Sequence, residues 1–188
     1  METIDNLVDK LYRVFRFLLD NIIGYGAALM MFIATWLAIF EVARRYIFGL
    51  VFPWGQDAVT YFLVASVFLY FAVTHASRSH LRVGIAMEVL EKRGWSRLVL
   101  SVRALISAMT VALFSFLAWY GVPTFERSMM MERKTLSLFL YIWPFQVCLI
   151  VAFSLLALAS LFHLYQDIRA MFGKKVFEWA PVEEGIDI

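Results

Sequence analysis

Four stretches of this chain contain no Asp, Glu, Lys or Arg, and together they make up half of its 188 residues. They are residues 21–40, 58–77, 104–125 and 135–166. A helix of about 20 apolar residues spans the hydrocarbon core of a bilayer, and each stretch is at least that long. Backbone amides find no water inside a bilayer, so such segments fold as helices. The sequence therefore predicts an all-α membrane protein, with residues 1–188 forming a single integral membrane domain that has four transmembrane helices.

The residues that flank each stretch set the expected limits of the four spans. We expect spans at about residues 22–40, 58–74, 99–121 and 143–162. Pro123 is expected to end the third span, because proline lacks a backbone donor and clashes with the preceding turn. Pro144 suits the first turn of the fourth span, where that donor would be unpaired anyway. Residues 135–142 then become an interfacial lead-in to the fourth span.

Two further segments, at about residues 4–18 and 81–93, place apolar residues at helical spacing with charged residues around them. This pattern is typical of amphipathic helices that lie on a membrane surface. We predict one such helix at the N-terminus and another between spans two and three. For the first segment the alternative is that it forms the wetter end of one long first helix.

The distribution of Lys and Arg predicts the orientation of the chain. The N-terminal segment, the connection between spans two and three and the C-terminal tail carry 12 of the 17 basic residues. Basic residues concentrate on the cytoplasmic side of multi-pass proteins. Both termini are therefore expected in the cytoplasm, and the other two connections are expected to face outward.

Composition excludes several classes of function. A net charge of +2 is too small to indicate nucleic acid as a partner. Cys148 is the only cysteine, so an intramolecular disulfide and a thiol redox pair are excluded. Ion-coupled carriers need ionisable or coordinating groups at mid-membrane depth, and none of the predicted spans has an acid or base there. We therefore expect that this chain does not translocate a polar solute by itself. Neither an enzyme nor a metal site is expected.

Two histidines leave one alternative function open. His75 and His163 should both lie near the cytoplasmic ends of their spans, the second and the fourth. Two histidines on facing helices at one depth can ligate a haem. The alternative is therefore a haem-binding membrane anchor of a respiratory enzyme. On the other interpretation both are interfacial polar residues, and no cofactor is expected.

The polar residues between spans one and two are clustered. Glu41, Arg44, Arg45 and Asp57 flank an apolar turn that contains Trp54. An acid–arginine pair near the membrane interface is less screened than it is in water. The cluster is either a solvated loop or a charge-paired corner that fixes the two spans and meets a partner.

The order of short motifs through the chain resembles one family of membrane proteins. The motifs are Arg45-Tyr46, an apolar turn, Trp54-x-x-Asp57, an apolar span, Arg78-x-His80-x-x-Val83 and a short amphipathic helix. In this order they resemble the small membrane subunit, the Q subunit, of tripartite ATP-independent periplasmic (TRAP) transporters. The family often has Glu where Asp57 stands, which keeps the charge.

The resemblance implies a setting and a role. It implies a bacterial or archaeal inner-membrane complex, in which a soluble periplasmic protein captures an organic acid, often a carboxylate. That protein hands the acid to a large permease subunit, which moves it inward with sodium. The small subunit is then a non-catalytic scaffold, or stator. Its expected partners are the large permease subunit, the periplasmic binding protein and membrane lipids.

Two groups of residues are candidate contacts on this interpretation. The candidates for structural or partner contacts are Arg44, Arg45, Trp54, Asp57 and His80. The connection at residues 126–134 is a candidate docking surface for the binding protein, because charged rims set encounter rate and specificity. Its charged residues are Glu126, Arg127, Glu132, Arg133 and Lys134. The plainer interpretation of this connection is a solvated loop.

Overall fold

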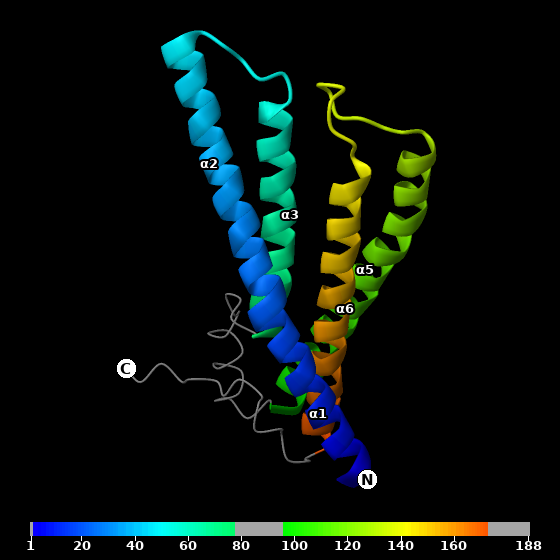
Figure 1. Cartoon of the computed structure of the whole chain (residues 1–188). Helices are drawn as coiled ribbons and strands as arrows, with labels where there is room; N and C mark the ends of the chain where they lie inside the picture. Colours follow the sequence, from blue (N-terminus) through cyan, green and yellow to red (C-terminus); the bar gives the residue numbers. More distant parts are fainter. Residues whose placement is uncertain (1, 78–95, 173–188) are drawn as a thin grey trace.

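The structure, a computed structural model, describes residues 2–77 and 96–172, with side chains for residues 7–77 and 99–172. Within these ranges the ordered elements are helices and there is no strand, as predicted (Figure 1). The elements are α1 (Glu2–Leu18), the π-helical segment η1 (Leu19–Ile23), α2 (Gly24–Phe48), α3 (Gly55–Ala76), α5 (Ser96–Met130) and α6 (Trp143–Met171). Four helical segments are long and apolar enough to cross a membrane: Leu7–Phe48, Gly55–Ala76, Val99–Met130 and Trp143–Met171. The predicted segment 81–93 lies outside the described residues.

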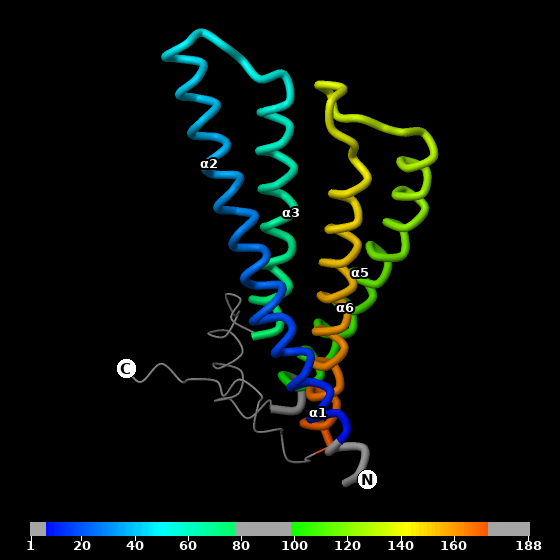
Figure 2. The backbone as a smooth tube through the Cα atoms, viewed as in Figure 1, coloured from blue at the N-terminus to red at the C-terminus, as the bar shows by residue number. Residues whose placement is uncertain are grey.

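The N-terminal segment continues into the first span without a turn. α1, η1 and α2 follow one another directly, and Figure 2 shows their backbone as one long helix. No turn therefore separates α1 from the first span. A π-helical turn accommodates an extra residue without breaking the helix. The alternative, in which residues 4–18 form the wetter end of a long first helix, describes this arrangement better.

The two prolines behave differently from each other. Pro144 lies in the first turn of α6, as predicted. Pro123 lies inside α5, which continues to Met130, so the prediction that it ends the third span is wrong. A proline removes a single backbone donor, and transmembrane helices tolerate this where neighbouring helices support them. That support is present here, because a Cβ built on Gly121 would lie 2.8 Å from Ile150 of α6.

The spanning helices form a row in the order α2, α3, α6, α5 (Figure 1). The extensive contacts join α2 to α3, α3 to α6 and α6 to α5. The inner members α3 and α6 have 28% of their most apolar segment buried, compared with 17% for the first helix and 6% for α5. The row therefore leaves much apolar side-chain surface uncovered, above all on α2 and α5 at its edges.

Small side chains at seven-residue intervals form the seams that join α2, α3 and α6. The buried alanines at this spacing are Ala27 and Ala34 on α2, Ala58, Ala65 and Ala72 on α3, and Ala152 and Ala159 on α6. A seven-residue period keeps one stripe of each helix against its neighbours. Small residues on that stripe let helices approach closely in a membrane. Glu41 lies seven residues after Ala34 and is buried at the end of the same stripe.

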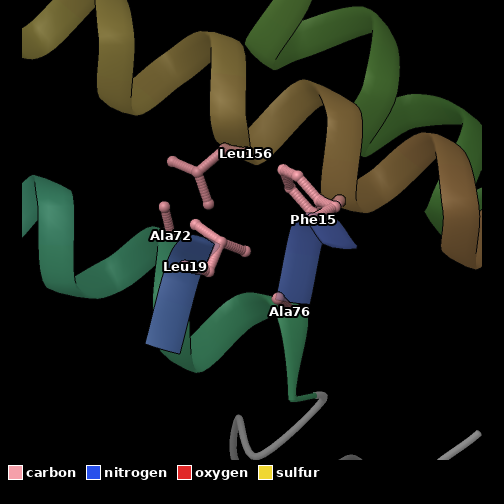
Figure 3. Packing of buried hydrophobic residues seen from close by; sticks show 6 residues of the cluster. Phe15, Leu19, Ala72, Ala76 and Leu156 are labelled. Carbon is pink, nitrogen blue, oxygen red and sulfur yellow. The ribbon is translucent and has the colours of Figure 1, made fainter. Parts of the chain in front are cut away.

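A cluster of larger side chains packs where α1 and η1 meet the end of α3 and the middle of α6. Phe15 and Leu19 pack against Ala72 and Ala76 of α3 and against Leu156 of α6 (Figure 3). Leu19 and Leu156 are both fully buried. The N-terminal helix is thus part of the packed core.

Candidate functional site

Polar side chains gather at both ends of the helix row. We call the end that holds the 49–54 and 131–142 connections the loop end, and the opposite end, where α1 lies, the N-terminal end (Figure 1). The residues predicted between spans one and two lie at the loop end. Some residues of α1, α3 and α6 that the sequence did not single out meet at the N-terminal end.

At the loop end, Glu41 is a buried acid that lies against the start of α3. It is 9% exposed, and Arg45 donates a hydrogen bond to its Oε1 over 3.3 Å. A Cβ built on Gly55, the first residue of α3, would lie 2.7 Å from its Oε2. A carboxylate is favoured at a helix N-terminus because the unpaired amides there carry partial positive charge. Gly55 therefore makes room for an acid that joins α2 to α3.

Arg44 and Trp54 hold the connection between these helices through aromatic contacts. The Arg44 guanidinium carbon lies 3.8 Å from the centre of the Phe52 ring. The Phe52 ring lies 5.2 Å from that of Trp54. A guanidinium over an aromatic face is attracted by the ring quadrupole. α2 ends at Phe48, and the connection begins with Gly49, whose φ of 64° suits a residue without a Cβ.

Asp57 ties α3 to the connection between α5 and α6. Its Oδ2 accepts a hydrogen bond of 2.9 Å from the backbone amide of Ser137, 80 residues away in the sequence. The hydroxyls of Thr135 and Ser137 are hydrogen-bonded to each other at 2.9 Å, and Thr135 is buried. Within the described residues, Asp57 thus makes a loop contact and no ion pair with an arginine. His80, the remaining predicted contact residue, lies outside the described residues.

The five charged residues proposed for docking are all exposed. Glu126 and Arg127 are in the last turns of α5, and the other three follow in the turn after it. The Lys134 ammonium lies 5.3 Å from the centre of the Tyr141 ring. Exposure suits both a docking surface and a solvated loop, so docking stays a prediction.

At the N-terminal end, three side chains converge on the carbonyl oxygen of Ala76, the last residue of α3. Tyr12 Oη donates to it over 3.1 Å, Arg16 Nη1 donates over 3.2 Å, and His163 Nε2 is 3.4 Å away. Helix C-termini leave carbonyls without intrahelical partners, and side chains satisfy them. We call this group the carbonyl clamp. It joins α1, α3 and α6 at a single acceptor.

The histidine pair lies inside this packed region. The rings of His75 and His163 are 5.4 Å apart and tilted by 54°. Nε2 of His75 is 2.8 Å from the hydroxyl of Ser160, and Nε2 of His163 faces the Ala76 carbonyl. Nε2 of each ring is thus engaged with the protein. The rings also lie too close for a macrocycle to stand between them, so the geometry does not favour the haem alternative.

Sequence reasoning missed the carbonyl clamp and the contact made by Ser137. In both, a side chain meets a backbone group, so the sequence offers no complementary residue pair to detect. A signal for the seams did exist, because Ala58, Ala65 and Ala72 repeat at seven residues. That repeat indicates which stripe of α3 is covered.

The comparison with protein families decides the identity of the chain. Residues 37–170 match the family described as tripartite ATP-independent periplasmic transporters, DctQ component. The chain belongs to the DctQ family. Comparisons with curated proteins and with solved structures gave no match. As a DctQ protein, the chain is the small subunit of a TRAP transporter, and its four apolar helices fit a multi-pass membrane protein. The family works in a tripartite complex with a large permease and a binding protein.

Proposed function

We propose that this DctQ subunit is a non-catalytic stator, which widens the stationary wall against which the large permease subunit moves its solute. The solute is an organic acid with a carboxylate group, and sodium drives its import. Both termini lie in the cytoplasm, which puts the loop end on the periplasmic side. No cofactor, metal or nucleic acid takes part.

The row of helices is the observation that carries this proposal. A row is wider than a closed bundle of the same helices, and it offers uncovered apolar edges to a membrane partner. Large side chains follow the exposed side of α2, including Tyr25, Leu29, Phe32 and Trp36. The described spans hold no charged group at mid-depth, so these spans lack the ionisable groups with which ion-coupled carriers bind and release ions. A stationary wall needs a wide row of helices with apolar edges, and it does not need groups that bind ions.

Cross-linking from the two edges of the row tests the stator proposal. Cys148→Ser gives a background without cysteine, because the chain has a single one. Phe32→Cys then places a thiol on α2, and Leu113→Cys places one on α5 at comparable exposure, 61% and 55%. In membranes that contain the large permease subunit, we expect one edge to cross-link to the permease and the other to serve as its control. Failure of both edges, together with recovery of the chain alone in mild detergent, would contradict the proposal.

We also propose that the exposed charges at residues 126–134 contact the periplasmic binding protein. Reversing Arg133 and Lys134 to glutamate should lower transport at limiting binding-protein concentration and leave transport at saturation unchanged, because rim charges act mainly on association. Reversal of Arg13, which is exposed at the N-terminal end, is the matched control. Unchanged transport in the limiting regime would refute docking at this connection.

A further inference from the structure

The connection between α5 and α6 is a small hairpin with an apolar tip. Its base is closed by hydrogen bonds of 3.1 Å from Ile142 N to Arg133 O and 2.8 Å from Thr135 N to Leu140 O. Lys134 and Tyr141 pair as an isolated antiparallel bridge. The four residues 136–139 form the tip.

The tip exposes large apolar side chains. Leu136 is 98% exposed, Leu138 is 72% exposed and Phe139 is 61% exposed. Leu138 has a φ of 63°, a left-handed conformation that leucine rarely adopts. A hydrogen bond of 2.8 Å from its amide to Thr135 O holds it there, beside the bond from Ser137 to Asp57. The fold thus fixes an apolar surface that no described part of the chain covers.

The anchor at Asp57 sets the depth of this tip. Asp57 is the last charged residue before the charge-free stretch 58–77. That stretch is 20 residues long, and at a rise of about 1.5 Å per residue its length matches a hydrocarbon core of about 30 Å. Asp57 therefore marks the edge of the hydrocarbon. Ser137 is bonded to Asp57, so its neighbours Leu136 and Leu138 lie at the same boundary.

Residues beside the tip have the chemistry of a lipid interface. Tyr141 in the hairpin and Trp143 at the start of α6 are exposed, and aromatic residues of this kind are enriched at the headgroup level. We propose that the tip, residues 136–139, inserts into the headgroup region of the nearer leaflet and binds phospholipid, with Asp57 as its positioning residue. This inference rests on the membrane-spanning fold and not on the proposed transport partners.

Spin-label depth measurements test the proposal. Cysteines replace Leu136, Leu138 or Phe139 one at a time in the Cys148→Ser background, in the full chain in nanodiscs that contain anionic phospholipid. Leu136 packs on nothing within the described residues, so its replacement removes no core contact. The references are a label at Phe32, on the exposed side of α2, and a label at Glu132, an exposed charge on the same hairpin. Accessibility to oxygen is compared with accessibility to a water-soluble nickel chelate.

We expect the ratio of oxygen to nickel accessibility at the three tip positions to be several-fold higher than at Glu132 and to approach that at Phe32. A ratio equal to that at Glu132 would place the tip in water and overturn the proposal. Low accessibility to both reagents would mean that protein covers the tip, which would also overturn it. Asp57→Ala should shift the Leu138 label toward the aqueous ratio, whereas Asp57→Asn keeps an acceptor for Ser137 and should not. Equal effects of Asp57→Ala and Asp57→Asn would show that the hydrogen bond from Ser137 to Asp57 does not position the tip.

Discussion

Replacing Tyr12 with phenylalanine should lower the free energy of unfolding by about 1 kcal/mol, the net contribution of a typical neutral hydrogen bond. Tyr12 is 2% exposed, and its hydroxyl donates to the Ala76 carbonyl over 3.1 Å. The substitution removes this donor and keeps the ring. The larger penalty for an unpaired buried acceptor, about 1–3 kcal/mol, is avoided because Arg16 still donates to the same oxygen over 3.2 Å.

Two further variants separate the hydroxyl from the ring and from the shared acceptor. Tyr12→Ala also removes the ring that packs edge-on against Phe162 at 5.3 Å, so it should cost about 3–5 kcal/mol. In the double variant Tyr12→Phe/Arg16→Met, His163 Nε2, at 3.4 Å, is the side-chain group that remains near the carbonyl within the described residues. That double variant should lose about 1 kcal/mol more than the sum of the two single variants, because residues that share a partner are coupled.

The assay is unfolding in mixed detergent micelles with increasing dodecyl sulfate, followed by far-ultraviolet circular dichroism. Arg16→Met alone is the control, since it also removes the hydrogen bond of 2.8 Å to Asp20. If Tyr12→Phe is as stable as the parent chain while Tyr12→Ala is strongly destabilised, only ring packing matters and the clamp does not stabilise the fold. Additive single variants would refute the shared-acceptor argument.

Three other substitutions probe the seams between helices. Gly55→Ala places a Cβ 2.7 Å from the Glu41 carboxylate, which must then move away from Arg45. We expect the free energy of unfolding to fall by about 1–3 kcal/mol in the same assay. An unchanged unfolding midpoint would contradict the contact between Glu41 and the start of α3. Gly121→Ala places a Cβ 2.8 Å from Ile150 and should lower the free energy of unfolding by about 1–3 kcal/mol through overpacking. Adding Ile150→Ala should restore part of this stability, and a lack of rescue would mean that the clash involves another residue. Ala65→Leu puts a large side chain at a position that is 1% exposed, so α3 should separate from its neighbours and the yield of monodisperse protein in detergent should fall. The control Val67→Leu changes a position that is 53% exposed and should behave like the parent chain.

The number and the approximate limits of the spans could be predicted because lipid imposes a simple rule on sequence. A charged side chain is costly in hydrocarbon, so the charge-free stretches had to be the spans. Pro123 was misjudged because the cost of a proline depends on what packs around it. Gly121 lets α5 come close to Ile150, and that contact supports the helix beyond the proline. The sequence alone does not decide whether residues 4–18 lie on the membrane surface or continue into the first span. The deciding contacts bury Tyr12 and Phe15 against residues of α3 and α6 that are far away in the sequence.

The sequence by itself determined that this is a membrane protein with four spanning helices and that the chain belongs with the small subunits of TRAP transporters. These properties follow from composition, length and motif order, each of which can be read along one chain. Only the tertiary structure decided that the helices stand in a row, that Asp57 holds the hairpin through Ser137, and that three side chains share the Ala76 carbonyl. In the last two cases a side chain meets a backbone group, and every residue type has the same backbone. The physical choice among such partners is made only when the helices are packed.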